Sequence, residues 1–262
     1  MQAIILAGGR GQRLDPFTRI LPKPLFPLGD EAMAAILVRQ LKGAGVEEII
    51  MSLGYLADLM IAYFQDGRRF GIPIRYIVES EPLGTAGPLK RVDGLGDDFL
   101  VVNADELTNL DFRALFAYHL SAQATMTVAV QKKNIASAFG VLEIREGQVI
   151  AYREKPTFDY WASMGIYVLN KQCLHLIPVG ESFDMPQLVQ RLLQVKARVL
   201  SYESRDVWYD IGTLGDLERA RQALSHVEEI QAGPACAGER IGGLEPETLV
   251  ESLDGVLPNR GK

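Results

Sequence analysis

The sequence predicts an α/β protein with a mainly parallel, mixed sheet sandwiched by helices. Short apolar runs typical of strands, at 48–53 and 74–78, alternate with segments at 31–42 and 57–64 whose apolar residues recur at helical spacing. Gly or Pro residues bound these segments, as expected where elements end. Such alternation is typical of βαβ units with right-handed crossovers. The 262 residues, 48% of them apolar, are enough to bury a large core.

The composition argues against several classes of protein. The net charge of −6 and the pI near 5.2 argue against a nucleic-acid surface, which needs a basic face, so any phosphate binding must be local. The first residues do not resemble a signal peptide and no apolar run approaches the length of a membrane span, so we expect a cytoplasmic protein with no membrane partner. Cys173 and Cys236 match no metal or disulfide pattern and are expected to be reduced. The three histidines have no ligand partner at i+2 or i+4 and are expected at the surface or at helix ends: His119, His175 and His226.

An N-terminal strand ends abruptly in a loop that contains Gly8, Gly9 and Gly11. Glycines let successive backbone N–H groups turn into one concavity and approach phosphate oxygens without an intervening Cβ. The interleaved Arg10 and Arg13 supply forked, charge-assisted donors, so the loop suits a polyanion. The alternative is an ordinary Gly-rich turn with solvated basic residues. The loop matches neither the Walker pattern, since no Gly-Lys-Ser/Thr closes it, nor the dinucleotide-binding fingerprint, since the glycine spacing differs.

Prolines stiffen the segment that follows the loop: Pro16, Pro22, Pro24 and Pro27. Proline fixes its own φ and pushes the preceding residue toward an extended conformation. The segment would therefore present Lys23 at a fixed reach beside the loop.

In open α/β sheets, ligands bind beyond the carboxyl ends of the strands, here expected at Leu6, Val78 and Val102. After Val78 the sequence reads ESEPLGTAGPL, residues 79–89. Its Gly-Thr-Ala-Gly segment lets backbone amides lie against a flat ring or a ribose. A helix predicted to begin at Pro88 would point its N-terminus into the cleft.

The next strand, predicted at 99–103, is almost wholly apolar and is followed by Ala104 and Asp105. An aspartate at the carboxyl end of a buried strand is costly to desolvate unless a cation lies beside it. Asp105 is therefore the first candidate metal ligand. A helix at 111–121 and a strand at 125–130 are predicted to follow.

From about residue 138 the predicted elements become shorter. Segments 139–144 and 149–153, joined by a turn, read as a hairpin, and 162–169 reads as another strand. Three more elements are predicted: a helix at 184–194, a strand at 199–202 and a helix that Thr213 can cap. The tail at 228–262 is rich in Gly, Pro and Glu and is expected to be a small appendage or partly disordered.

The string GGRGQRLDPFT at 8–18 followed by PKPL at 22–25, directly after an N-terminal strand, resembles the signature of the sugar-1-phosphate nucleotidyltransferases. Later motifs extend the resemblance over about residues 1–225. One departure is Gln12, where the family usually has Thr. The resemblance implies a Rossmann-like nucleotidyltransferase domain with two halves: domain 1–227, nucleotide-binding half 1–135, and a smaller, β-rich sugar-binding half 136–227.

The resemblance also implies roles for particular residues. Asp105 and Asp210 would bind Mg²⁺, Arg13 would hold the β- and γ-phosphates, and Lys23 the reacting phosphates. Taken alone, Asp210 would more often be a turn or capping residue. The implied nucleotide-binding residues are Leu6, Ala7, Gly8, Gly9, Gly11, Arg13, Glu79, Pro82, Gly84, Thr85 and Ala86. The implied sugar-phosphate-binding residues are Lys23, Asn103, Gly140, Glu154, Lys155 and Gly165, although Glu154 and Lys155 could also be an exposed ion pair.

Glu79 lies where many members of the family place the residue that reads the edge of the base. A carboxylate only accepts hydrogen bonds, so it suits the adjacent N1–H and N2–H₂ donors of guanine better than the single N3–H of uracil or thymine. Guanine is therefore favoured, and the alternative is that Glu79 and Glu81 are solvated loop acids. The sugar stays open, because Ser163-Met164-Gly165 stands where relatives have Asn-Ala-Gly or Asn-Thr-Gly.

The resemblance implies an enzyme that joins a nucleoside triphosphate and a sugar 1-phosphate with release of pyrophosphate, either alone or as a homodimer or higher homo-oligomer. Guanylyltransferases of mannose or heptose 1-phosphate are the best match, through LGTAG and PKPL; uridylyl- or thymidylyltransferases of hexose or amino-sugar 1-phosphates are the alternative. A nucleotide-sugar glycosyltransferase would normally need a DxD-like metal motif, and the sequence offers only Ala-Asp-Glu around Asp105. The non-enzymatic alternative is a regulatory homologue. Such homologues tend to lose the loop Arg, the Lys or an Asp, and this chain keeps them all.

Overall fold

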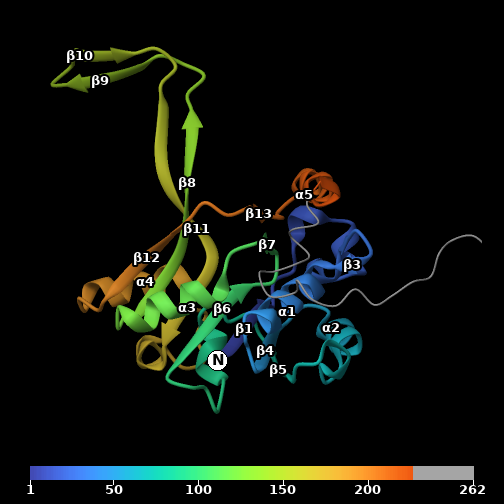
Figure 1. Ribbon diagram of the computed structural model, residues 1–262. Helices are drawn as coiled ribbons and strands as arrows, with labels where there is room; N and C mark the ends of the chain where they lie inside the picture. The colour runs from blue at the N-terminus through green and yellow to red at the C-terminus, as the bar shows by residue number, and fades with distance from the viewer. Residues whose placement is uncertain (227–262) are drawn as a thin grey trace, which may run out of the picture.

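The computed structural model describes residues 1–226, so the tail predicted at 228–262 lies outside the described residues. A seven-stranded sheet forms the centre of the molecule, in the order β12-β8-β11-β6-β1-β4-β5 (Figure 1). The strands are β1 (Gln2–Ala7), β4 (Glu48–Leu53), β5 (Ile74–Val78), β6 (Asp98–Asn103), β8 (Met126–Ala136), β11 (Thr157–Asn170) and β12 (Val199–Ser204). β11 is antiparallel to both of its neighbours, and all other neighbours are parallel. The predicted mixed, mainly parallel sheet is confirmed.

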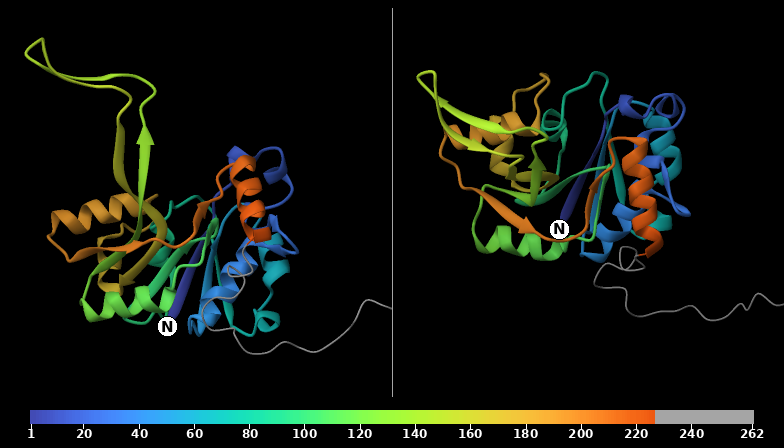
Figure 2. Two further views of the ribbon diagram at one scale, coloured as in Figure 1. Left: turned by 45° about the horizontal axis from the view of Figure 1, so that its top comes forward. Right: turned by 90° about the horizontal axis from the view of Figure 1, so that it is seen from above.

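Helices cover both faces of the sheet (Figures 1 and 2). The side chains of β1 explain why its sequence is a continuous apolar run: Ile5 packs in the core on one face, Ile4 in the core on the other, and both are fully buried. One face is covered by α1 (Met33–Gly43), α2 (Ala57–Phe64) and α3 (Phe112–Ser121). The other face is covered by α4 (Met185–Gln194) and two 3-10 helices, η5 (Gly87–Arg91) and η6 (Lys171–Leu176).

The loop segment after β1 contains three short 3-10 helices, which are η1 (Gln12–Leu14), η2 (Phe17–Arg19) and η3 (Lys23–Leu25). A further 3-10 helix, η4 (Arg68–Phe70), follows α2. The last helix of the described residues, α5 (Leu214–His226), packs against the loop segment through a third apolar cluster that includes Leu14, Ile36 and Leu217. Contact with α5 therefore holds the loop segment against the body.

Two small antiparallel sheets were not predicted. One pairs β2 (Pro27–Leu28) with β3 (Glu31–Ala32), and the other pairs β7 (Glu106–Thr108) with β13 (Trp208–Asp210). Strands of two or three residues are too short to give a periodic pattern in the sequence. The β7–β13 pair joins two parts of the chain that are distant in sequence.

Three further predictions were wrong in detail. The segment at Pro88 forms the five-residue 3-10 helix η5, and the N–H groups of Ala86 and Gly87 both donate to the carbonyl of Phe183, each at 2.8 Å, instead of pointing into a cleft. His119, expected to be a surface or capping histidine, does lie in the last turn of α3, but it is 1% exposed and its ring contacts Thr127 and Asp98. Strands β8 and β11 extend well beyond the predicted segments 125–130 and 162–169.

The extra length of β8 and β11 forms a two-stranded ribbon that continues from Val130 paired with Ser163 to Ala136 paired with Thr157. The predicted hairpin is confirmed as β9 (Val141–Arg145) and β10 (Gln148–Arg153), which lie beyond the ribbon. We call residues 131–162 the arm. It projects from the body in Figure 1 and in the left view of Figure 2, and the right view of Figure 2 looks down along it.

Cys173 is a buried free thiol, and burial raises its pKa to about 12, in agreement with the reduced state predicted for it; Cys236 lies outside the described residues. None of the helices within residues 1–226 has the length and apolar character needed to cross a membrane.

Candidate functional site

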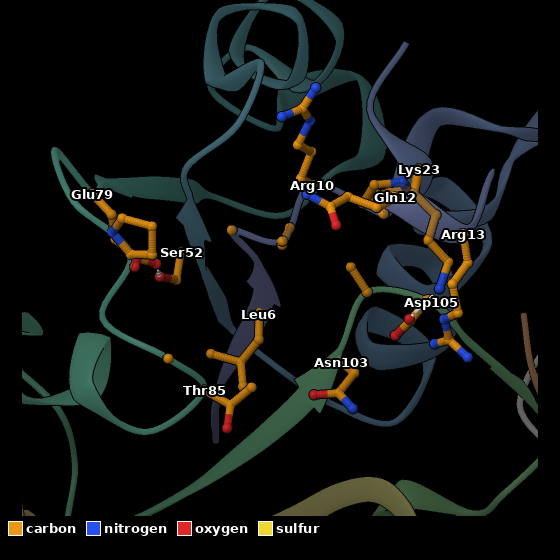
Figure 3. A pocket seen from close by; sticks show the side chains of 18 residues that line it. Leu6, Arg10, Gln12, Arg13, Lys23, Ser52, Glu79, Thr85, Asn103 and Asp105 are labelled. Atoms are coloured by element: carbon orange, nitrogen blue, oxygen red, sulfur yellow. Dashed lines mark hydrogen bonds and ion pairs between the residues drawn. The ribbon is translucent and has the colours of Figure 1, made fainter. Parts of the chain in front are cut away.

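A cavity of about 580 Å³, which we call the pocket, opens at the carboxyl ends of β1, β4 and β6 (Figure 3). It brings together most of the predicted nucleotide-binding residues with three residues from the metal and sugar-phosphate sets. The predicted residues that line it are Leu6, Ala7, Gly8, Gly9, Gly11, Arg13, Lys23, Glu79, Pro82, Gly84, Thr85, Asn103 and Asp105. It is also lined by Arg10 and Pro24 of the predicted phosphate loop and the stiffened segment, and by three residues that had no predicted role: Gln12, Ser52 and Ala104.

Some predicted site residues do not line the pocket. Ala86 is fully buried beneath its wall. Gly165 lies under the floor, where a Cβ would overlap the side chains of Asn103 and Glu106. Gly140, Glu154 and Lys155 belong to the arm and are not among the lining residues.

Two glycines of the loop after β1 lie so close to neighbouring side chains that a Cβ would crowd them. A Cβ on Gly8 would lie 2.8 Å from Oε1 of Glu79. Gly11 has φ +65°, and a Cβ there would lie 3.3 Å from the Cβ of Lys23. The loop therefore passes close to side chains at both ends of the pocket.

Cationic side chains gather at one end of the pocket, beside Asp105. Lys23 is 8% exposed, and its ammonium pairs with the Oδ2 atom of Asp105. Arg13 lies against Gly212, because a Cβ at Gly212 would be 2.7 Å from the Nη1 atom of Arg13. Figure 3 shows the ends of the Lys23 and Arg13 side chains close to Asp105. Arg10 extends away from this group, and its guanidinium lies 5.4 Å from the centre of the Tyr55 ring.

Three carboxylates meet beside this end of the pocket. The β7–β13 ladder places Asp210 opposite Glu106, and the N–H of Ile211 donates to the carbonyl of Asp105 at 3.3 Å. One oxygen each of Asp105, Glu106 and Asp210 lie within 4.8 Å of one another. The sequence prediction placed Asp105 and Asp210 together, and the structure brings them together.

Glu106 had no predicted role. It is 8% exposed, its Oε2 accepts from Trp208 Nε1 at 2.7 Å, and its Oε1 accepts from Asn103 Nδ2 at 3.3 Å. Burial, with the nearby charge of Asp105, raises the pKa of Glu106 to about 8. The only signal in the sequence is that Glu106 follows Asp105, and its meeting with Asp210 depends on the β7–β13 register.

The pKa of Asp210 is also raised, first by partial desolvation and then by the negative charge of Asp105. Clustered carboxylates whose pKa values rise in this way repel one another, and a divalent cation relieves that repulsion. Carboxylate oxygens are the ligands that Mg²⁺ prefers. The donor set therefore fits a hard divalent cation.

Glu79 and Ser52 lie at the opposite end of the pocket (Figure 3). The Ser52 hydroxyl donates to Oε1 of Glu79, and the N–H of Leu83 donates to Oε2, each at 2.9 Å. Each oxygen keeps a second acceptor position. Ser52 is 1% exposed. The signal in the sequence that could have identified it is a polar residue near the end of an otherwise apolar strand.

A cluster of hydrogen bonds ties the wall Leu83–Gly87 to residues 183–185. The N–H of Phe183 donates to the carbonyl of Leu83 at 2.8 Å, and the N–H of Thr85 donates to Oδ1 of Asp184 at 2.9 Å. The N–H of Met185 donates in turn to the Thr85 hydroxyl at 2.8 Å. We call this contact the 183–185 clip. It fixes the wall residues Gly84 and Thr85 to the start of α4.

Comparison with known proteins agrees with this geometry. The family model described as nucleotidyl transferase matches residues 2–226. A D-glycero-alpha-D-manno-heptose 1-phosphate guanylyltransferase from Aneurinibacillus thermoaerophilus is 32% identical over 86% of this chain and 99% of that protein. A mannose-1-phosphate guanylyltransferase from Mycobacterium tuberculosis is 31% identical over 92% of this chain and 68% of that protein.

The chain is also similar to a relative whose name specifies a different nucleotide base, and to a solved structure. A UTP–glucose-1-phosphate uridylyltransferase from Synechocystis is 30% identical over 84% of this chain and 62% of that protein. The crystal structure of HddC from Yersinia pseudotuberculosis superposes with a TM-score of 0.67 at 25% identity, covering 85% of this chain and 99% of that one.

Proposed function

This chain belongs to the nucleotidyl transferase family, and on that premise we propose that it transfers a nucleotidyl group from a nucleoside triphosphate to a sugar 1-phosphate, releasing pyrophosphate. The observation that carries the proposal is the composition of the pocket. A glycine-rich loop, two cationic side chains and Asp105 converge at one end, and the turn at Gly84 and Thr85 forms a wall. A polyanion and a ring can occupy such a pocket together.

The reaction needs little covalent work from the protein. An oxygen of the sugar phosphate attacks the α-phosphorus in line, a new P–O bond forms, and the bond from the α-phosphorus to the bridging oxygen of pyrophosphate breaks. The attacking phosphate is already ionised, so no general base is needed. Positioning and charge neutralisation are the contributions asked of the chain.

In this proposal, the phosphate ligands come from the cationic end of the pocket. Arg13 holds the β- and γ-phosphates, and Lys23 contacts the reacting phosphates. The N–H groups around Gly8, Gly9 and Gly11 complete the cradle. Loss of either cation would leave developing charge on the leaving pyrophosphate uncompensated.

Asp105 and Asp210 are the proposed ligands of Mg²⁺, and Glu106 lies close enough to support them. When bound there, the ion would neutralise charge on the phosphates that meet in the reaction. The ammonium of Lys23 pairs with the same carboxylate of Asp105. Asn103, held by Glu106, is the proposed contact to the sugar phosphate on the floor.

For the substrates, we propose guanosine triphosphate and mannose or heptose 1-phosphate. Two relatives that match most of this chain are guanylyltransferases of these sugars. The carboxylate of Glu79 is the proposed reader of guanine, since each of its oxygens can accept one more hydrogen bond. The similar uridylyltransferase makes UTP with glucose 1-phosphate the second candidate pair.

A panel assay tests the proposal. Four nucleoside triphosphates and dTTP are combined with mannose, heptose, glucose and amino-sugar 1-phosphates, and pyrophosphate release is measured with and without Mg²⁺. Mg²⁺-dependent release that is fastest with GTP and mannose or heptose 1-phosphate is expected. Fastest release with UTP or dTTP would move the base assignment to a pyrimidine, and absence of release with every pair would contradict the proposed function.

A further inference from the structure

A second cavity, of about 560 Å³, shares no lining residue with the pocket. Three basic side chains and two acidic ones line it, together with aromatic rings. The basic residues are Arg39, Lys42 and Arg69, and the acidic residues are Asp30 and Glu31. We call this cavity the groove. Its volume is in the range of cavities that hold small molecules.

Helix α1 forms one side of the groove. Its residues Ala35, Arg39 and Lys42 line the groove, and their spacing of four and then three residues places them on one stripe of the helix. The stripe spans about 10 Å, at about 1.5 Å per residue. Other side chains of α1, such as those of Leu37 and Leu41, are buried in the core against the sheet. The groove therefore lies on the outer side of α1.

The end of the groove beside η4 carries positive charge with no carboxylate to balance it. Neither Lys42 nor Arg69 makes an ion pair or a hydrogen bond within residues 1–226. The neighbouring Arg68, in contrast, pairs with Asp66 at 2.9 Å and does not line the groove. The two unpaired cations are therefore the ones that face the cavity.

Contacts with other segments position both of these cations. The guanidinium of Arg69 lies 4.1 Å from the centre of the Tyr63 ring and 4.6 Å from the centre of the Phe70 ring. A Cβ at Gly71 would overlap the ammonium of Lys42, so this side chain reaches from α1 to the segment that follows Arg69. Lysine and arginine donate charge-assisted hydrogen bonds to phosphate oxygens. This end of the groove therefore fits a phosphate group.

The other end of the groove offers hydrogen-bond acceptors. Asp30 and Glu31 precede the start of α1 at Met33, whereas Lys42 lies in its last turn. Glu31 pairs with Arg39 through Oε1, and its Oε2 atom is buried without a hydrogen-bond partner. Among the residues that the structure describes, no other buried side-chain oxygen or nitrogen lacks a partner. Carboxylate oxygens only accept hydrogen bonds, so this end suits the hydroxyl groups of a ligand.

We propose that the groove binds a phosphorylated polyol, such as a sugar phosphate, with its phosphate on Lys42 and Arg69 and its hydroxyl groups toward Asp30 and Glu31. The order of charges along the groove supports this choice of ligand. An inorganic anion would use only the cationic end, and an uncharged sugar would use only the acidic end. The proposal does not rest on the proposed function, because no residue of the groove lines the pocket.

Isothermal titration calorimetry with glucose 6-phosphate tests the cationic end. The phosphate of this probe is not at C1, so the probe is not a substrate of the proposed reaction. We expect saturable binding to the wild type, and at least about tenfold weaker binding to Lys42→Met and to Arg69→Met, since each change removes a charge-assisted contact. Arg68→Met is the matched control, because it removes a neighbouring cation outside the groove, and it should bind as the wild type does. Equal melting temperatures of the four proteins show that the fold is kept.

Two further comparisons test the ligand class and the location. Inorganic phosphate should bind to the wild type more weakly than glucose 6-phosphate does. Asp30→Ala should weaken the binding of glucose 6-phosphate and leave that of inorganic phosphate unchanged. Lys23→Met, which alters the pocket, should bind glucose 6-phosphate as tightly as the wild type does.

The outcomes are distinct. Absence of glucose 6-phosphate binding, or equal weakening by Arg68→Met and Arg69→Met, would overturn the site. Binding that is lost in Lys23→Met and kept in Lys42→Met would place the ligand in the pocket and overturn it as well. Inorganic phosphate that binds as tightly as glucose 6-phosphate would overturn the polyol as ligand. None of these measurements uses turnover, so a failure of the proposed nucleotidyl transfer would leave them unaffected.

Discussion

Lys23 and Asp105 form an ion pair at the end of the pocket, and the lysine is almost completely buried. The same carboxylate is a proposed ligand of Mg²⁺, so the ammonium and the ion compete for it. Lys23→Met removes the competing charge while keeping the apolar stem. We expect it to bind Mn²⁺, used as a spectroscopic substitute for Mg²⁺, several-fold more tightly in the absence of nucleotide, as measured by electron paramagnetic resonance. Turnover should fall by about 100-fold at the same time, because a phosphate ligand is lost. Weaker Mn²⁺ binding would contradict the competition.

Asp105→Asn and Asp210→Asn should each lower kcat by about 100-fold or more, because each removes a charge that holds the ion at the reacting phosphates. Both should also weaken Mn²⁺ binding to the free protein. Asp216→Asn is the control, because Asp216 accepts from the N–H of Thr213 at 2.8 Å at the start of α5 and does not belong to the acidic group. A variant of Asp105 or Asp210 that keeps normal Mg²⁺-dependent turnover would show that its carboxylate is structural.

Gly212 determines where the guanidinium of Arg13 can lie. A Cβ at position 212 would be 2.7 Å from Nη1 of Arg13, so Gly212→Ala must displace that side chain. We expect kcat/KM for the nucleoside triphosphate to fall by about 10-fold, and Arg13→Ala in the same background to add little, since the two changes act on one group. Gly215→Ala is the control, because a Cβ there has no neighbour closer than 3.7 Å. Additive losses of kcat/KM in the double variant would show that Gly212→Ala does not act through Arg13.

Glu79→Gln tests how the base is read. The amide keeps one acceptor but places a donor opposite a donor of guanine, a loss of about 1 to 3 kcal/mol of discrimination. We expect kcat/KM for GTP to fall and the preference to shift toward UTP and dTTP, measured side by side in both proteins. In the structure Glu79 also holds Ser52 and the N–H of Leu83, so a second outcome has a clear meaning. An equal fall for all three nucleotides would show that Glu79 supports the wall and does not read the base.

His119 should make stability depend on pH. Its Nδ1 lies 2.8 Å from the Thr127 hydroxyl and its Nε2 lies 3.1 Å from Asp98, and burial outweighs the nearby carboxylate to lower the pKa of the imidazole. The unfolded chain therefore takes up a proton first as the pH falls below about 6.5. The contribution is fully present above that pH and is lost as the pH falls through the lowered pKa of the folded state.

Urea unfolding at pH 7.5 and pH 5.5 measures this effect. The free energy of unfolding of the wild type should be lower at pH 5.5, and the difference should be smaller in His119→Gln. His175→Gln, at an exposed position, is the control and should keep the wild-type difference. An unchanged pH dependence in His119→Gln would mean that other groups cause it.

The body of the fold could be predicted because burial leaves a strong pattern. β1, β4 and β6 are covered on both faces, so they read as continuous apolar runs, and α2 was predicted with its observed ends, Ala57–Phe64. The arm could not be predicted, because a solvent-exposed ribbon needs no periodic burial. The polar run from Gln131 to Asn134 therefore indicated the end of a strand that in fact continues to Ala136.

The residues of the candidate site also divide into those that the sequence could predict and those that it could not. The loop glycines and Lys23 lie close together in the sequence, so spacing and backbone chemistry predicted that end of the pocket. Asp105 and Asp210 meet only through a three-residue ladder, and nothing in their local sequences indicates that pairing. Glu106 was missed for the same reason, since its partner Trp208 comes from a distant segment.

The 183–185 clip has a consequence for cutting and rejoining this chain. Thr85 and Asp184 bind each other across what would be the junction between two separately made fragments, and β6 of the first fragment would lie beside β11 of the second. Fragments ending and beginning near residue 135 would each expose an unpaired strand edge, and the first would carry the residues that line the pocket without the clip that holds its wall. Split at that point, the protein would be a reporter of fragment proximity, silent until both pieces meet and fold together.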